Sequence, residues 1–247
     1  MISFLICALN EEKHIKATVN TIYESIKKVK FIDKFEIVIV NDGSTDLTEE
    51  IILNLQSKDQ NIIYCKNNIN LGYGKSVNKG LKKIKYPKFM VIPGDNDMTM
   101  GAITSALKHL NSADLIMVFP VNTDNRSKGR NIISILYRLI YLIFFDCYVN
   151  YINSPSICPT EKVKSLKLQS SRFSIISEIL TKLLHSDITY CEVPAFWDTS
   201  LRKRTTLGVK NLLDVFISFI KLFLEMKIFS KNKFSKKSIR KNIHTWF

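Results

Sequence analysis

The sequence predicts an α/β fold: a mostly parallel sheet with helices on both faces. Apolar runs of strand length alternate with helix-periodic segments through the first 120 of the 247 residues. Those runs are almost continuously apolar, which is typical of strands buried on both faces. Polar turns rich in Asp, Asn and Gly follow two of them. In such sheets ligands bind beyond the carboxyl ends of the strands.

The first elements follow from apolar spacing and helix-start signals. Strands are expected at residues 2–7, 35–40, 61–65, 88–92 and 114–119. Asn10 can cap a helix in which Ile15 and Val19 begin a helical repeat. Asp46 and Glu49 resemble a capping box that opens a second helix, ending at residue 55. Further helices are expected at residues 75–84 and 102–110.

The texture changes after Pro120. A polar, basic loop (122–130) leads into an apolar helix (131–145), and a second such helix is expected at 209–229. Each has one narrow polar stripe; on the first, Arg130, Ser134 and Arg138 stand four apart. A shorter amphipathic helix covers 175–184. The predicted parts are therefore 1–120 for the first half, 121–208 for the second and 209–247 for the last helix and a basic tail.

Charge points to an anionic partner. Lys+Arg 36 against Asp+Glu 22 gives a net charge of +14, which favours nucleotides, phosphorylated lipids or anionic bilayers. No zinc-finger spacing or RNA-binding aromatic motif is present, so nucleic acid is not expected as a partner. The sequence leaves oligomeric state open.

The two apolar helices could be core helices, an oligomer interface or helices lying in a membrane surface. The tail that follows carries seven cations and no acid from Lys227 to Lys241. Each contributes about 1 kcal/mol near an anionic leaflet, which favours the membrane surface. No apolar stretch reaches the roughly 20 residues of a membrane span, and the first apolar run lacks a positive leader. We therefore expect a cytoplasmic protein bound peripherally to the inner face of the membrane.

Cysteine and histidine usage argues against a zinc or disulfide framework. The five cysteines form no C-x-x-C pair, and the four histidines are scattered singly. A reducing compartment fits this pattern.

Acidic residues supply the candidate metal site. Asp42 follows one predicted strand, while Asp95 and Asp97 follow another. An Asp-x-Asp at a strand end can hold a divalent cation, Mg²⁺ or Mn²⁺, and leave positions for a diphosphate. A turn is the alternative, because Gly94 and Asn96 also suit one. The second acidic turn, at Asp42, favours the metal site.

Four ordered segments resemble the family 2 glycosyltransferases, which have the GT-A nucleotide-sugar fold, a Rossmann-like α/β arrangement. The segments are LICALNEE (5–12), IVIVNDGSTD (37–46), NLGYGKSVNKG (70–80) and MVIPGDND (90–97). The second half resembles the polyprenyl-phosphate branch, such as dolichyl-phosphate mannose synthase. That likeness rests on Arg130-x-x-x-Ser134, residues 177–180, residues 192–194 and the basic run 202–204.

The resemblance implies roles for single residues. Ala8, Leu9 and Glu11 would border the nucleotide base, Asp42 would hydrogen-bond base or ribose, and Gly72 and Lys75 would lie along the nucleotide. Asp95 and Asp97 would flank the metal and the diphosphate, with Asn96 beside the nucleotide sugar. Arg126, Arg130 and Ser134 would grip the acceptor phosphate, and Arg202 or Arg204 would close over the donor diphosphate. Lys75 and the stripe of Arg130 and Ser134 could instead be solvated surface.

Some positions depart from the family pattern. Cys7 stands where Pro is common and Leu9 where Tyr is frequent. Thr99 occupies a position that often carries a Gln metal ligand, so the metal would have fewer protein ligands and more water ligands. Thr205 to Gly208 replace the usual Gly-Ser-Lys after the basic loop.

The predicted function is an inverting, metal-dependent transfer of a sugar from a nucleotide-sugar donor to a polyprenyl phosphate. An ionised phosphate is already nucleophilic, so no protein base is required. The alternative is a hydroxyl acceptor in cell-surface polysaccharide synthesis, which needs a base among Asp124, Glu178 and Asp198. Glu178 could equally be a solvated helix residue. A noncatalytic peripheral membrane protein of the same fold is the third hypothesis.

Overall fold

A computed structural model describes residues 1–122, 128–196 and 209–243; the side chains of Lys128, Arg130 and residues 209–212 lie outside this description. The strands are β1 (Ile2–Ala8), β2 (Phe35–Asp42), β3 (Ile62–Asn67), β4 (Lys88–Pro93), β5 (Leu115–Pro120), β6 (Ser156–Pro159), β7 (Thr189–Ala195) and β8 (Ile239–Arg240). The α-helices are α1 (Ile15–Val29), α2 (Thr48–Lys58), α3 (Tyr73–Leu81), α4 (Met100–Lys108), α5 (Lys128–Phe145), α6 (Thr160–Lys164), α7 (Ile175–Leu184) and α8 (Val209–Phe223). A π-helical turn, η1 (Leu224–Phe229), continues α8, and a 3-10 turn, η2 (Lys231–Phe234), follows it.

The strands form an eight-stranded sheet in the order β3-β2-β1-β4-β6-β5-β7-β8. The pairs around β1 are parallel, with Ala8 opposite Asn41 of β2 and Cys7 opposite Pro93 of β4. β6 runs antiparallel to both β4 and β5, and the other pairs are parallel. The predicted mostly parallel α/β fold is thus confirmed. Asp42 at the end of β2 and the acids that follow β4 lie at one edge of the sheet, on either side of the end of β1.

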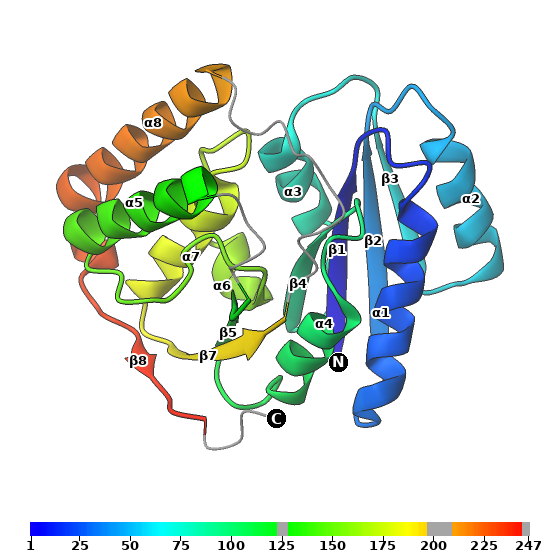
Figure 1. Cartoon of the computed structure of the whole chain (residues 1–247), viewed down its shortest axis with the longest axis horizontal. Coiled ribbons are helices and arrows are strands. Elements are labelled where there is room, and N and C mark those ends of the chain that lie inside the picture. Colours follow the sequence, from blue (N-terminus) through cyan, green and yellow to red (C-terminus); the bar gives the residue numbers. More distant parts are fainter. Residues whose placement is uncertain (123–127, 197–208, 244–247) are drawn as a thin grey trace.

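Helices cover both faces of the sheet (Figure 1). Alternate β1 side chains supply the two cores, because successive strand residues point to opposite faces. Phe4 and Ile6 pack with residues of α1, α2 and α4 on one face, and Leu5 packs with α3 and α7 on the other. All five cysteines are free and buried.

The helices α5 and α8 lie side by side as an outer layer over α7 (Figure 1). Aromatic rings join them: the ring of Phe219 on α8 lies 5.4 Å from Phe144 and 5.5 Å from Phe145 of α5. Tyr141 and Phe145 are buried beneath. These helices cover the ranges expected for the two apolar helices, with η1 forming the last part of the second.

Two predicted helix starts are wrong. α1 begins at Ile15 with no side-chain cap, because Asn10 has φ 55° and its side-chain oxygen instead accepts from the Thr45 N–H at 2.9 Å. α2 begins at Thr48, and Asp46 accepts from the Thr48 N–H at 3.0 Å rather than forming a capping box. Glu49 is drawn to β3, where it pairs with Lys66 at 2.8 Å. Asn10 and Glu49 thus each contact another segment of the chain, at Thr45 and Lys66, instead of capping a helix.

Candidate active site at the carboxyl edge of the sheet

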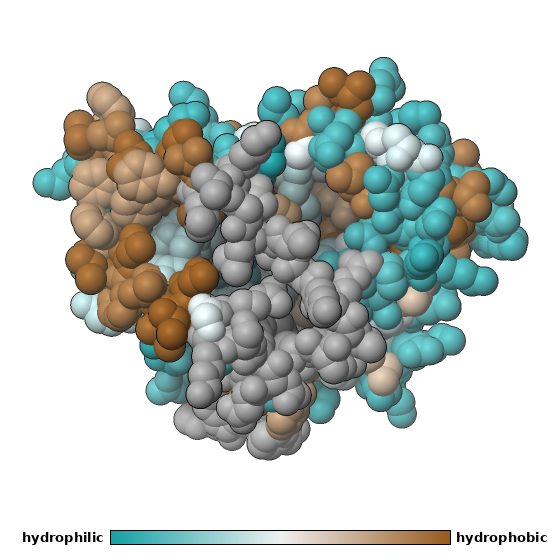
Figure 2. Space-filling model, turned by 45° about the horizontal axis from the view of Figure 1, so that its top comes forward, coloured by the Kyte–Doolittle hydropathy of each residue, from teal (hydrophilic) through white to brown (hydrophobic). Residues whose placement is uncertain are grey.

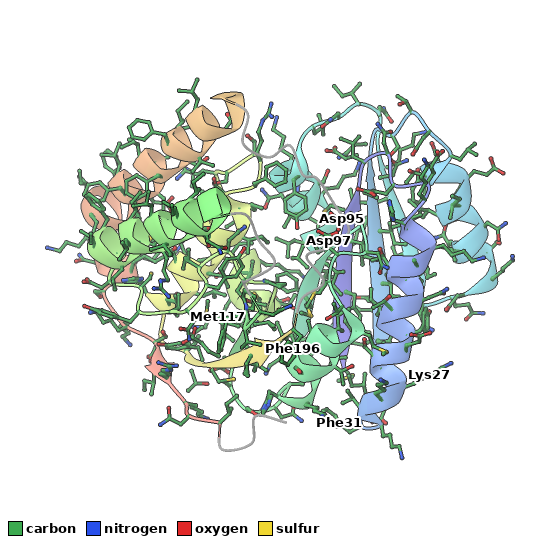
Figure 3. All side chains as sticks on the ribbon, viewed as in Figure 1. Lys27, Phe31, Asp95, Asp97, Met117 and Phe196 are labelled. Atoms are coloured by element: carbon green, nitrogen blue, oxygen red, sulfur yellow. The ribbon has the colours of Figure 1, made fainter. Side chains whose placement is uncertain are left out.

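The turn after β4 brings Asp95 and Asp97 together. The Asp97 N–H donates to Asp95 Oδ1 at 3.2 Å, and both residues are half-buried. Figure 3 shows the two side by side at the end of β4. Asn96 between them adopts the left-handed region, φ 57°, which Asn tolerates better than most residues. The turn alternative and the acid pair are therefore one structure, with the carboxylates placed by the turn.

Helix α1 holds this turn in place. Thr18 Oγ1 donates to the carbonyl oxygen of Gly94 at 2.9 Å, and Thr21 Oγ1 donates to Asn96 Oδ1 at 3.0 Å. A Cβ atom on Gly94 would lie 3.1 Å from the Cys7 carbonyl oxygen, so glycine allows the turn to lie close to β1. Asn96 stays a predicted nucleotide-sugar residue. Its oxygen already ties the turn to α1.

Asp42 ends β2 and is 4% exposed. Its Oδ1 accepts from Asn67 Nδ2 at 2.8 Å and from the Leu71 N–H at 2.9 Å, while its Oδ2 accepts from the Gly72 N–H at 2.9 Å. A carboxylate has about four acceptor positions, and three of those of Asp42 are occupied by donors of its own chain. Asp42 thereby fixes the chain entering α3, and its predicted contact with base or ribose stays a prediction.

Three of the predicted nucleotide residues lie at the end of β1: Ala8 is its last residue, and Leu9 and Glu11 belong to the loop that follows. Ala8 is buried, whereas Leu9 is exposed. The Glu11 N–H donates to Thr48 Oγ1 at 2.8 Å. This loop is therefore tied to the start of α2, which leaves Leu9 as an exposed apolar side chain at the edge where a base is expected.

Gly72 and Lys75 mark the start of α3. Gly72 is the N-cap residue with φ 94°, a conformation open to glycine. Lys75 is exposed in the first turn. Anions are favoured at helix N-termini. A cation in this turn adds to that preference.

The predicted acceptor residues are only partly placed. Ser134 is half-buried on α5, and Arg130 belongs to the same helix with its side chain outside the described part. Arg126, Arg202 and Arg204 lie outside the described residues, as do Asp124 and Asp198. Their roles stay predictions.

Glu178 is neither a solvated residue nor an available base. It is 2% exposed, and its oxygens accept from the backbone N–H groups of Gln169 and Ser170 at 2.9 and 2.8 Å. Lys182 Nζ lies 2.7 Å from Oε1. A general base must reach a proton on the acceptor, whereas this carboxylate is enclosed by donors of its own chain.

Thr99 has a structural role that its sequence position did not predict. Thr99 Oγ1 accepts from the Ala102 N–H at 3.1 Å as the N-cap of α4, and donates to the Phe196 carbonyl oxygen at 2.8 Å. Phe196 follows β7 (Figure 3). This hydrogen bond holds the end of β7 close to Thr99, two residues after Asp97. The chain continues from Phe196 toward Arg202 and Arg204. The cap itself could have been predicted, because Thr is a preferred N-cap residue, whereas no local pattern indicates the contact with Phe196.

Burial raises the pKa of the Cys7 thiol, and the charges of Asp42 and Cys65 raise it further. Cys7 is thus a neutral, apolar side chain under the site. Elsewhere, a hollow of about 200 Å³ is lined by Arg138, Leu142, Cys147, Tyr148, Val149, Asn150, Glu192 and Arg240. It contains none of the predicted nucleotide residues. The acids after β4 thus lie apart from this hollow.

Comparison with known proteins agrees with this geometry. The family model described as Glycosyl transferase family 2 matches residues 3–161. A dolichyl-phosphate beta-glucosyltransferase of Trichomonas vaginalis is 31% identical over 97 residues, 38% of this chain and 30% of that protein. A teichoic acid poly(glycerol phosphate) polymerase of Staphylococcus epidermidis is 30% identical over 114 residues, 46% of this chain and 15% of that protein. The matches thus span less than a third of either relative.

A solved structure shows the same fold across most of the chain. It is the glucosyl-3-phosphoglycerate synthase from Mycobacterium tuberculosis in complex with Mn²⁺, uridine diphosphate and phosphoglyceric acid. The TM-score is 0.64 at 16% identity, covering 90% of this chain and 78% of that one. The likeness therefore extends beyond the first half of the chain.

Proposed function

The chain belongs to glycosyl transferase family 2, and we propose that within it the protein is an inverting, metal-dependent enzyme that moves a sugar from a nucleotide-sugar donor to a polyprenyl phosphate at the cytoplasmic face of a membrane. The observation that carries the proposal is the edge of the sheet where Asp42 and the Asp95–Asp97 turn flank the end of β1. Neighbouring strands lie about 4.8 Å apart. Two strand spacings, roughly 10 Å, suit a nucleoside diphosphate lying across β1.

Asp95 and Asp97 would hold the cation, Mg²⁺ or Mn²⁺. They fit it chemically, because both are half-buried carboxylates brought together by one turn, and hard cations take oxygen ligands. Within the described residues no group of three or more His, Cys, Asp or Glu comes together. Diphosphate oxygens and water would complete the coordination, as is usual for Mg²⁺. When bound, the cation offsets the negative charge that builds on the departing nucleoside diphosphate.

The chain's own residues would do the rest. Asp42 holds Gly72 and the start of α3, along which the nucleotide would lie. Arg204 or Arg202 would add positive charge to the leaving diphosphate, and Arg126, Arg130 and Ser134 would orient the acceptor phosphate. Preorganised charge of this kind lowers the barrier most in a site that excludes water.

A phosphate acceptor is supported by the state of Glu178. Of the three acids that could serve a hydroxyl acceptor, Glu178 is the described one, and its carboxylate is enclosed by the Gln169 and Ser170 N–H groups and Lys182. A phosphate oxygen attacks the anomeric carbon without losing a proton, so inversion needs no protein base.

The outer layer supports a membrane acceptor. α5 and α8 carry many exposed apolar side chains, among them Ile143 at 70% and Phe216 at 62%. Figure 2 shows them gathered over these two helices. No helix within the described part combines the length and apolarity needed to cross a membrane. The cations of the tail after Lys227 favour an anionic bilayer as the surface that covers this face.

The direct test incubates the purified protein with candidate nucleotide sugars, Mg²⁺ or Mn²⁺, and undecaprenyl or dolichyl phosphate. We expect a sugar-phosphate lipid as product, and we expect Asp97→Ala to lower its formation at least 100-fold with an unchanged melting temperature. Full turnover by the folded variant would refute the metal assignment. Donor turnover that consumes a sugar hydroxyl rather than lipid phosphate would refute the acceptor assignment.

A further inference from the structure

The segment 169–173, between α6 and α7, lies against the first turn of α3. The Gly74 N–H donates to the Ser171 carbonyl oxygen at 2.9 Å. A Cβ atom on Gly74 would lie 2.4 Å from a carbonyl oxygen of this segment, so only glycine permits the approach. The ring of Tyr73 stacks on Phe173 at 5.9 Å. The end of α3 that faces the proposed donor thus has the second half of the chain as its wall.

Glu178 holds this segment as Asp42 holds the chain entering α3. Each is a buried carboxylate that accepts the backbone N–H groups of two successive loop residues: Gln169 and Ser170 for Glu178, residues 71 and 72 for Asp42. Such charge-assisted hydrogen bonds are stronger than neutral ones. The start of α3 is therefore fixed from two directions.

The same segment is tied to the outer helix. Lys182 is fully buried and its Nζ lies 2.7 Å from Glu178 and 2.9 Å from Glu225 of η1. Arg172 Nε lies 2.7 Å from Asp214 Oδ2 of α8. Two ion pairs thus connect segment 169–173 and its anchor to the continuous helix α8–η1.

We infer that segment 169–173 is a support of the donor site and that Glu178, Lys182 and the Arg172–Asp214 pair are positioning residues for nucleotide-sugar binding. The inference rests on the proposed function, in which Gly72 and Lys75 line the nucleotide. Displacing the segment removes the wall behind Gly74 and lets the first turn of α3 shift. The expected effect is on donor affinity, because none of the three groups reaches the proposed reacting atoms.

The test measures binding of UDP and GDP, each with Mn²⁺, by titration calorimetry on the full chain. We expect Asp214→Asn to raise the Kd three- to tenfold, because it breaks the ion pair that holds segment 169–173 to α8. The pair is exposed, so the variant should fold. The matched control is Asp187→Asn, since Asp187 forms an exposed ion pair with Lys236 at 3.0 Å away from α3. The exchange of Arg172→Asp with Asp214→Arg should restore the wild-type Kd.

Steady-state kinetics separates positioning from catalysis. The donor KM should rise in Asp214→Asn, with the acceptor KM and the kcat at saturating donor unchanged. Glu178→Gln turns an acceptor into a donor that faces backbone N–H groups, so we expect a larger loss of donor affinity from it. If Glu178→Gln does not fold, the donor affinity of Asp214→Asn alone tests the inference. A wild-type chain that binds neither nucleotide would overturn the proposed function and this inference with it; folded variants with the wild-type Kd would overturn the inference alone.

Discussion

Removing two apolar side chains from the outer face of α5 and α8 should release the protein from anionic vesicles. Ile143 is 70% exposed and Phe216 is 62% exposed. Full burial of such a side chain contributes about 1.5–3 kcal/mol. Scaled by these exposed fractions, each contributes about 1–2 kcal/mol and the two together about 2–4 kcal/mol. Since 1.4 kcal/mol is tenfold, Ile143→Gln with Phe216→Gln should weaken partitioning roughly 30- to 700-fold.

The assay is co-sedimentation with vesicles of phosphatidylglycerol and phosphatidylethanolamine at fixed ionic strength. Gln keeps the helix propensity of both positions, and both side chains are exposed, so the melting temperature should change little. The control is Phe31→Gln: Phe31 is 45% exposed and lies beside the end of α1, away from the outer layer (Figure 3). A double variant that partitions like the wild type would refute the reasoning. If the wild type forms a dimer and does not bind vesicles, and the double variant is a monomer, a second copy of the chain covers this face instead.

Two further predictions concern stability. Burial lowers the pKa of His185, so between the folded pKa and the unperturbed value near 6.5 the unfolded state binds more protons than the folded state. The free energy of unfolding should therefore stay constant above pH 6.5 and fall as the pH drops from 6.5 to the folded pKa. His185→Gln should flatten that slope in urea titrations. Gly43 has φ +75° and a Cβ there would lie 2.5 Å from the Ile69 carbonyl carbon, so Gly43→Ala should cost at least about 1–3 kcal/mol. Gly101→Ala on α4, where the nearest atom is 3.8 Å away, should not destabilise; equal stability of the two variants in denaturant would contradict the strain.

The elements of the first half (1–120) were predictable because its strands are continuously apolar, as burial on both faces of a sheet requires. Residues 2–7, 35–40 and 88–92 all fall within observed strands, and the helix expected at 175–184 spans Ile175–Leu184. Strand β6 was not predicted. It has four residues, with Ser156 at its start and Pro159 at its end, and its place between β4 and β5 depends on pairing with distant strands rather than on its own pattern.

Side-chain roles were harder to predict than elements. Asn10 and Asp46 have the residue types of helix caps, yet Asn10 accepts from Thr45 across the loop, and Asp46 accepts from Glu12 N–H as well as from Thr48. A local motif and a contact between loops use the same oxygen atoms, so spacing alone does not choose between them. Glu178 shows the same limit, since its partners at residues 169 and 170 belong to a segment without a helical or strand period.

The carboxylates at the sheet edge divide into two kinds by exposure. Asp42 is buried with three donors from its own chain, whereas Asp95 and Asp97 are half-buried on a turn. A buried charge is retained when hydrogen bonds satisfy it, so Asp42 serves best as an anchor that shapes the start of α3. A cation needs carboxylates that solvent and a diphosphate can reach. In the proposed site we therefore assign the metal role to Asp95 and Asp97, and the shaping of the donor site to the two buried anchors, Asp42 and Glu178.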